Sequence, residues 1–168
     1  MRTIKFRGKD IVTGEWVVGN LFQGKRQGED YAVILMDKRY VHEEKLPEDI
    51  PFGFYKDEIT VVDPKTVGQF AGLFDCEKRE IYEGEIIKTY VCFLDEDDET
   101  REFWRVGVVQ FISGKYQLTN CVNYDDEATE IKSELQPSPK MQYSFPAYRS
   151  KIIGNIHDNP ELLKGGTL

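Results

Sequence analysis

The residues that could do chemistry begin with a partial zinc motif. Residues 42–46 read His-Glu-Glu-Lys-Leu, which starts like the helical zinc-binding pattern His-Glu-x-x-His. That pattern needs two imidazoles one helical turn apart, and the second position holds Leu46 in this chain. The surrounding composition is typical of a loop. We therefore interpret His42 and its neighbours as a solvated loop.

A second candidate is the acidic run at residues 95–99, which reads Asp-Glu-Asp-Asp-Glu. Its alternating acids resemble the first ligands of a calcium loop. An EF-hand also needs Gly at its sixth place and a bidentate Glu at its twelfth, and these places hold Thr100 and Val106. We interpret the run as a solvated hairpin tip, whose like charges also discourage edge-to-edge pairing of sheets. A weak cation site is the alternative.

A third candidate has the acid-x-Lys spacing of metal-dependent nucleases. Glu130 and Lys132 provide this spacing, downstream of Asp125 and Asp126. Nuclease sites of this kind hold metal ions with carboxylates and stabilise charge with a cation. With 31% charged residues in the chain, the same spacing arises often by chance. We favour a solvated helical face and keep the nuclease as an alternative.

Nucleophilic and nucleotide-dependent catalysis have little support. The chain has two histidines and no Gly-x-Ser-x-Gly pattern. His157 precedes Asp158, but neighbours on a strand point to opposite faces, so we do not expect a base and its orienting carboxylate. Ser113-Gly114-Lys115 lacks the other residues of a P-loop. The sequence therefore predicts no catalytic residue, no metal ligand and no cofactor.

The charge balance bears on possible partners. The chain has 22 basic and 30 acidic residues, for a formal net charge of −8. Such a field repels phosphate, which disfavours general binding of DNA or RNA. The 9 Tyr and 10 Phe residues could still form a local stacking platform for single strands. We favour the interpretation that most of them form the core.

The same sequence indicates a location. No apolar run approaches the roughly 18 residues needed to span a bilayer, and the N-terminal residues lack the apolar region of a signal peptide. The three cysteines, Cys76, Cys92 and Cys121, are odd in number and widely spaced. They are typical of reduced thiols, so we expect a cytoplasmic protein.

Strand patterns run through the first third of the chain. Ile4 and Phe6 alternate with basic residues, which is the period-two signature of a half-buried strand. Further strands are predicted at residues 15–22, 31–36 and 58–62, with loops at residues 23–30 and 37–55. Asp63-Pro64 is a good start for a helical turn. We place the boundary between an N-terminal β unit, residues 1–63, and a second unit, residues 64–168, at this point.

The second unit is also predicted to be mainly β. Strands are expected at residues 67–73, 80–82, 85–94, 102–112, 115–122 and 152–156, with a turn at Ser113-Gly114 and a longer loop at residues 75–79. Their spacing is similar to that of small SH3-like barrels. Ala128, Ile131 and Leu135 fall at helical spacing within residues 125–136, and Asn159-Pro160 predicts a final helical turn. The predicted fold is all-β with one or two short helices.

Three motifs resemble those of a known family. They are residues 66–73 (Thr-Val-Gly-Gln-Phe-Ala-Gly-Leu), residues 80–88 (Glu-Ile-Tyr-Glu-Gly-Glu-Ile-Ile-Lys) and residues 151–164, which contain Gly-Asn-Ile-His-Asp-Asn-Pro. Their order and positions resemble the YopX-like family of phage and prophage proteins over essentially the whole chain. The resemblance implies a phage or prophage origin and a β-rich fold, and it implies no activity. The motif residues that we expect to be structural are Gly68, Gln69, Gly72, Tyr82, Gly84, Gly154, Asn155, Asn159 and Pro160.

The sequence as a whole therefore predicts a non-enzymatic interaction protein of bacterial cytoplasm that associates with itself. A host or phage protein is a further expected partner, and no membrane partner is expected. The first alternative is a modulator of nucleic-acid processes, which binds single strands locally or occupies a basic host protein with its acidic surface. The second alternative is the metal-dependent nuclease.

Overall fold

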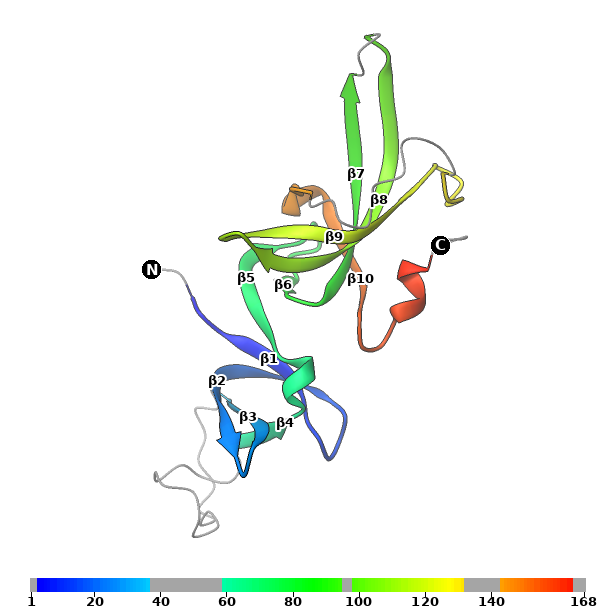
Figure 1. Ribbon diagram of the computed structural model, residues 1–168. Coiled ribbons are helices and arrows are strands. Elements are labelled where there is room, and N and C mark those ends of the chain that lie inside the picture. The colour runs from blue at the N-terminus through cyan, green and yellow to red at the C-terminus, as the bar shows by residue number, and fades with distance from the viewer. Residues whose placement is uncertain (1–2, 37–58, 95–97, 132–142, 165–168) are drawn as a thin grey trace. The chain divides into compact units, whose positions relative to one another are not determined.

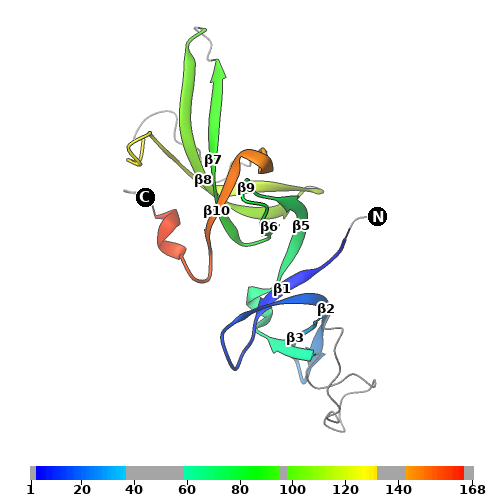
Figure 2. The same cartoon turned by 180° about the vertical axis from the view of Figure 1, so that it is seen from behind.

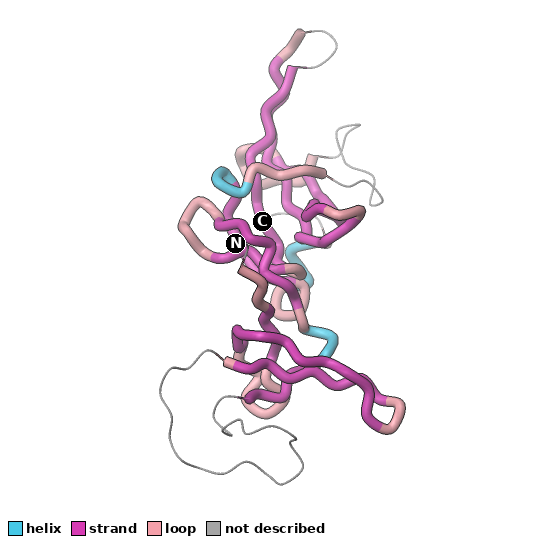
Figure 3. Tube along the Cα trace, turned by 90° about the vertical axis from the view of Figure 1, so that its left-hand side faces the viewer, coloured by secondary structure: helices cyan, strands magenta, loops and turns pink. Residues whose placement is uncertain are grey.

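The computed structural model describes residues 3–36, 59–94, 98–131 and 143–164 (Figure 1). These residues form antiparallel β-strands and short 3-10 helical turns, as the tube in Figure 3 shows by colour. The all-β prediction is therefore confirmed. The chain divides into two compact units, residues 1–70 and 71–168. The boundary that the sequence places after residue 63 stays a prediction.

The first unit is one antiparallel sheet. Its hydrogen-bonded order is β4-β3-β2-β1-β5, and β5 continues into the second unit, where β6 is its neighbour. The strands are β1 (Phe6–Lys9), β2 (Trp16–Arg26), β3 (Glu29–Leu35), β4 (Ile59–Val62) and β5 (Gly68–Phe74).

The prediction of a loop at residues 23–30 is wrong. The structure extends β2 to Arg26, and its last residues pair with β3 from Gln23↔Ala32 to Arg26↔Glu29. Only Gln27 and Gly28 turn the chain, with φ of 53° and 89°. A two-residue turn with positive φ angles matches the twist of the two strands that it joins. The strand pairing can therefore continue through the polar residues 23–26.

The core of the first unit lies on one face of this sheet. Ala32, Ile34 and Val62 are at most 1% exposed there. The predicted helical turn at Asp63-Pro64 is confirmed as η2 (Pro64–Thr66). The Asp63 side chain caps this turn by accepting a hydrogen bond from the Lys65 N–H. The Thr66 hydroxyl in turn accepts the Lys9 N–H at 2.8 Å, which attaches η2 to β1.

The second unit is built around a four-stranded antiparallel sheet of order β10-β7-β8-β9. The predicted two-residue turn between β8 and β9 is confirmed at Ser113 and Gly114, which both have positive φ. An SH3-like barrel stays a prediction for this unit. Its strands and turns are β6 (Glu80–Tyr82), β7 (Glu85–Leu94), β8 (Thr100–Ile112), β9 (Lys115–Tyr124), η3 (Ala147–Arg149), β10 (Ser150–Asn155) and η4 (Pro160–Leu163).

Two apolar clusters make up the core of the second unit. Alternation along β7 sends Ile86 to one cluster and Ile87 to the other, and both side chains are 0% exposed. The Ile86 cluster also receives Leu162 and Leu163 from η4. The final helical turn predicted at Asn159-Pro160 is therefore confirmed, and it packs back onto the sheet.

The helix predicted at residues 125–136 is wrong in its described part. Residues 125–131 form a turn and β-bridges, with Tyr124 bridged to Glu130. The Ile131 N–H donates to the carbonyl of Asn123 at 3.0 Å, so strand-like pairing with the end of β9 takes the donor that a helix would use. Residues 132–136 lie outside the described residues.

Candidate functional site

The end of the β7–β8 hairpin extends beyond the neighbouring strands β9 and β10 of the second unit. β7 and β8 pair without interruption from Ile86↔Val108 to Leu94↔Thr100. β10 ends its pairing with β7 at Ser150↔Thr89, and β9 ends its pairing with β8 at Trp104↔Tyr124. Within the described chain, residues 90–94 therefore pair only with β8, and residues 100–103 pair only with β7. We call these residues the arm, which projects from the sheet in both Figure 1 and Figure 2.

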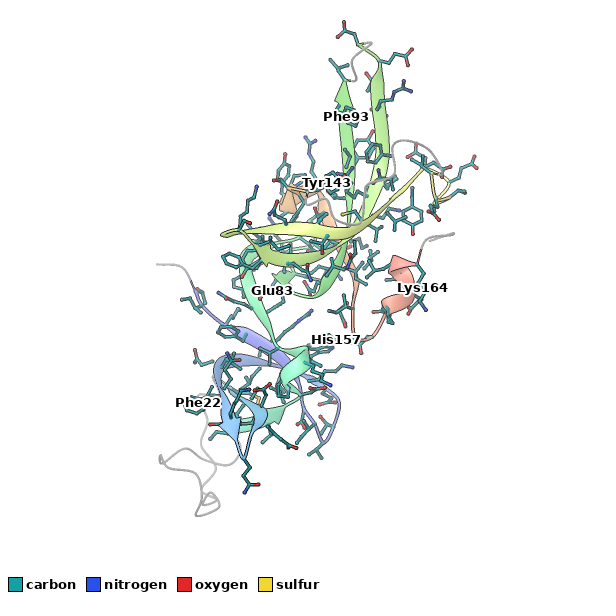
Figure 4. The ribbon with its side chains drawn as sticks, viewed as in Figure 1. Phe22, Glu83, Phe93, Tyr143, His157 and Lys164 are labelled. Carbon is teal, nitrogen blue, oxygen red and sulfur yellow. The ribbon has the colours of Figure 1, made fainter. Side chains whose placement is uncertain are left out.

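The arm carries large apolar side chains that remain in contact with water. Phe93 is 41% exposed and Leu94 is 65% exposed, and Figure 4 shows Phe93 on the projecting part of the hairpin. The Phe93 ring meets the ring of Phe103 edge to face, with centroids 6.1 Å apart. A two-stranded hairpin of this kind is only marginally stable by itself in water. Its exposed apolar surface is therefore a candidate contact surface.

Tyr90, Cys92 and Leu94 share one face of the arm, and this face presents polar groups beside the Leu94 side chain. The Cys92 thiol donates to the Glu102 carboxylate at 3.6 Å. Partial desolvation, followed by the charge and the hydrogen bond of Glu102, raises the pKa of Cys92, so the thiol stays protonated at neutral pH. A hydrogen bond to Glu102 likewise raises the pKa of Tyr90 to about 12. This face can present hydrogen-bonding groups, and it lacks an activated nucleophile.

The base of the arm is anchored by Arg105. Its guanidinium lies 3.7 Å from the centroid of the Tyr143 ring, and its Nε donates to the Asn123 amide oxygen at 3.0 Å. Burial lowers the pKa of Arg105 from its usual value. Asn123 is 0% exposed, so Arg105 connects the base of the arm to a buried side chain of β9.

The outer edge of β10 is closed by the loop at residues 75–79. The Asp75 carboxylate accepts the Ile152 N–H at 3.2 Å, and the Arg79 guanidinium donates to the Ile152 carbonyl at 2.7 Å. The Cys76 N–H donates to the Ser150 carbonyl at 2.9 Å. These contacts use the main-chain groups that an added strand would need. The loop thus protects β10 from pairing with another chain.

The motif residues near the end of the chain fit against those that precede β7. Gly84 has φ of +78° and its carbonyl accepts the Ile156 N–H at 2.9 Å. A Cβ on Gly154 would lie 2.6 Å from the Asn159 side-chain oxygen, so only glycine fits there. The Asn155 side-chain oxygen accepts two main-chain N–H groups, those of residues 157 and 158.

The remaining motif residues lie on β5, on β6 or at the start of η4. Gly68 and Gln69 pair with β1 in the first unit. The Tyr82 N–H donates to the buried Glu85 carboxylate at 2.9 Å. Gly72 has φ of +76° on β5, and Pro160 begins η4. Among these residues, Gly68 and Gln69 pair strands, Gly72 adopts a positive φ, and Pro160 begins a helical turn.

The other sequence candidates are not brought together. The Asp125 carboxylate accepts the Thr129 N–H at 2.8 Å, whereas the Asp126 carboxylate accepts the indole N–H of Trp104 at 3.1 Å. The His157 N–H and the Asp158 side chain both bond to Asn155. The residues that the structure describes contain no group of three His, Cys, Asp or Glu side chains that could hold a metal ion. The partial zinc motif, most of the acidic run and Lys132 lie outside them.

Sequence reasoning missed both the arm and the Asp75–Arg79 pair. The sequence predicts the lengths of β7 and β8. It does not predict the residues at which β9 and β10 stop pairing with them. The sequence predicts only that Asp75 and Arg79 belong to a loop. The one local signal was an acid and a base four residues apart in a polar turn, a spacing that is common in charged sequences.

The fold and this site define an all-β protein of two units, one of which carries a projecting two-stranded arm. The chain belongs to the YopX protein family, whose model matches residues 5–164. Among solved structures it is similar to protein EF1440 from Enterococcus faecalis, with 18% identity, a TM-score of 0.41, and coverage of 98% of this chain and 100% of that chain. A comparison with curated proteins finds no match. None of the described helices is long and apolar enough to span a membrane.

Proposed function

We propose that this protein is a non-enzymatic interaction module that associates with copies of itself, in the cytoplasm of a bacterial cell that carries a phage or prophage. The observation that carries the proposal is the arm, a two-stranded projection with Phe93 and Leu94 exposed. Burying apolar surface contributes about 25 cal/mol per Å², so covering these side chains stabilises a complex. A partner also completes a hairpin that has no third strand among the described residues.

The non-enzymatic part of the proposal rests on how the candidate side chains are used. Asp125, Asp126 and Asp158 accept hydrogen bonds that shape turns or hold an indole ring. The raised pKa of Cys92 disfavours a reactive thiolate. These are structural tasks, and they favour an interaction role over acid–base or nucleophilic chemistry.

Self-association predicts a mass that depends on concentration. In size-exclusion chromatography with light scattering, we expect the mass to rise above the 19.5 kDa of one chain as the protein is concentrated. The double variant Phe93→Ser, Leu94→Ser should weaken association at least tenfold, because it removes the exposed apolar surface of the arm. Phe22→Ser is the matched control, since Phe22 is 63% exposed in the other unit. A mass of one chain at every concentration would contradict the proposal.

A second candidate function is the binding of single-stranded nucleic acid by the first unit. Arg7 and Lys9 lie two positions apart on β1 and so share one face, and Lys5 lies just before the strand begins. Lys5 lies 4.9 Å from the Phe70 ring centroid, and Arg7 lies 4.5 Å from that of Trp16. Phe70 is only 4% exposed, so Trp16 is the ring of this pair that a base could reach. Cations beside a reachable ring are typical of surfaces that bind single strands.

The salt dependence of binding tests this second candidate. The Arg7 Nε and Nη2 atoms are buried, so Lys5 and Lys9 are the cations that can meet phosphates. If both neutralise a phosphate, log K for a labelled single-stranded oligonucleotide should fall with log salt with a slope of about −1.4. Lys5→Ala with Lys9→Ala should flatten that slope, whereas Lys115→Ala with Lys164→Ala removes the same charge elsewhere and should not. No change in fluorescence anisotropy at low salt, for single strands or duplexes, excludes direct binding.

A further inference from the structure

We infer that two copies of this chain pair through the outer edge of β7, with their arms antiparallel and with Cys92 facing Cys92 of the second copy. The inference rests on the proposed self-association, and it specifies the surface, the orientation and the register. The edge in question is residues 90–94, which continue β7 past the point where β10 ends.

The hydrogen bonds of β10 reveal which main-chain groups of the arm face outward. The N–H and C=O of Ile152 point away from β7, because Asp75 and Arg79 bind them. Ile152 is opposite Ile87, so the main-chain groups of Ile87 point toward β8. Alternation along β7 then turns the main-chain groups of Tyr90, Cys92 and Leu94 to the outer edge.

No described strand covers this edge, although η3 lies beside β7 near the point where the edge begins. Past Thr89, no described strand pairs with the outer side of β7. The edge of β10 is closed by the loop at residues 75–79, as its contacts with Ser150 and Ile152 show. An added strand therefore finds its donors and acceptors on the arm and not on β10. Unpaired edges of this kind readily accept a strand from another chain.

The sequence of the edge is complementary to itself in one antiparallel register. With Cys92 on the two-fold axis, Val91 lies opposite Phe93 of the second copy, and Tyr90 lies opposite Leu94 of the second copy. Each contact occurs twice, as an isologous interface requires. An aromatic ring opposite a β-branched or aliphatic side chain is a favourable cross-strand pair. The exposed Phe93 and Leu94 both become covered in this register.

The charges select the antiparallel orientation. Asp98 and Glu99 lie at the tip of the hairpin, whereas Arg149 and Lys151 flank the point where the open edge begins at Ser150. Two arms that ran side by side in the same direction would bring both acidic tips together. In the antiparallel arrangement each tip approaches the basic residues of the other copy. Opposite charges there steer the encounter and fix the register.

The size of this interface sets its strength. Only residues 90–94 of each copy pair, which is fewer than the 20 to 30 residues per side of a stable standard interface. The equilibrium is therefore between monomer and dimer, and it shifts with protein concentration and with salt. Obligate oligomers would need additional surface.

Cross-linking of the full chain tests the register directly. Cys76 and Cys92 are both exposed and Cys121 is buried, so Cys76→Ser leaves Cys92 as the exposed thiol and Cys92→Ser leaves Cys76. A facing Cys92 pair has Cα atoms about 5.5 Å apart, within the range of a disulfide. With copper-phenanthroline at mildly alkaline pH, the Cys76→Ser variant should form a reducible dimer at least tenfold faster than the Cys92→Ser variant. Equal rates overturn the inference.

A charged side chain at residue 92, on the proposed two-fold axis, tests the edge pairing separately from self-association in general. Cys92→Lys puts two like charges opposite each other across the axis, so it should raise the dissociation constant measured by light scattering at least tenfold. The fold of one chain should tolerate this change, because the Glu102 carboxylate lies opposite residue 92 on β8 and can form an ion pair with the lysine. Phe22→Lys is the control and should leave association unchanged. Unchanged association of Cys92→Lys overturns the edge pairing alone, whereas a wild-type chain that is always monomeric overturns the self-association as well.

Discussion

Replacing Asp75 by alanine is expected to lower the free energy of unfolding of the second unit by about 3 kcal/mol. The Asp75 side chain is 0% exposed. Its oxygens accept the N–H groups of Glu77 and Arg79 at 2.9 Å, the Arg79 guanidinium at 2.7 Å and the Ile152 N–H at 3.2 Å. Removing the carboxylate leaves several of these donors without an acceptor. It also releases the loop that closes the edge of β10.

Urea unfolding followed by tryptophan fluorescence measures this effect. The chain has one tryptophan in each unit, Trp16 and Trp104, so a Trp16→Phe background makes the fluorescence report on the second unit alone. Glu77→Ala is the matched control, because Glu77 forms only surface ion pairs with Arg79 and Lys151. Such pairs contribute about 1 kcal/mol or less. Equal losses in Asp75→Ala and Glu77→Ala would show that the buried carboxylate has no special role.

The same carboxylate predicts a dependence of stability on pH. Burial by itself would raise the pKa of Asp75, but the hydrogen bonds from Arg79, Ile152 and Glu77 together lower it below the ordinary value of 3.8. Since the folded state has the lower pKa, the stabilisation is complete above the unfolded pKa and is lost as pH falls through the folded one. The gap in unfolding free energy between wild type and Asp75→Asn should stay constant from about pH 7 to about pH 5 and shrink below about pH 4. A gap that does not change on acidification would contradict this account.

The substitution Gly19→Ala is expected to destabilise the first unit by about 3 kcal/mol or more, or to prevent its folding. A Cβ at this position would overlap the carbonyl oxygen of Leu35 and would lie 2.8 Å from its carbonyl carbon. Leu35 is part of β3, which pairs with β2 next to Gly19 through Asn20. Because the obstacle is the backbone of a paired strand, relief requires a shift of the whole β2–β3 ladder.

A second glycine of the same strand provides the control for this prediction. At Gly24 an added Cβ would meet the end of the Tyr31 side chain, with the hydroxyl 2.9 Å away. That side chain can rotate, so Gly24→Ala should cost about 1 kcal/mol or less. The measurement is urea unfolding of both variants in a Trp104→Phe background, where Trp16 reports on the first unit. Similar midpoints for the two variants would show that β3 moves easily away from Gly19.

The two predictions concern different parts of the proposed function. Loss of the Asp75 carboxylate should open the edge of β10 next to the open edge of the arm, so Asp75→Ala should also increase nonspecific association. Gly19 lies in the first unit, so Gly19→Ala should leave the Cys92 cross-linking rate of any folded chain unchanged. This contrast links the stability measurements to the edge pairing proposed for β7.

The sequence by itself determined where most of the strands lie and where two of the short turns occur. A run rich in β-branched and aromatic residues identified β7 with its observed bounds. Asp63-Pro64 and Ser113-Gly114 identified a helical turn and a hairpin turn. These signals are local, because they depend on the alternation of side chains and on the φ angles that a few residues prefer. Family membership was also visible in the sequence, through motifs whose residues shape the backbone.

Local signals failed where contacts from elsewhere in the chain outweighed them. The polar residues 23–30 were predicted to be a loop, but pairing with β3 extends β2 through Arg26. The spacing of Ala128 and Ile131 predicted a helix, but hydrogen bonds to the end of β9 hold those residues in turns and bridges. In both segments intrinsic propensity is weak, and the pairing available in the folded chain decides the outcome.

Only the tertiary structure decided the candidate site. The bond between Asp75 and Ile152 joins residues 77 positions apart, and the open edge of the arm exists because β10 ends its pairing at Ser150. Neither feature leaves a pattern at neighbouring positions, since a residue's partner across a sheet depends on register and on how far the adjacent strand extends. The sequence therefore determined the strands, and their pairing in three dimensions determined which strand edge is left open for another chain.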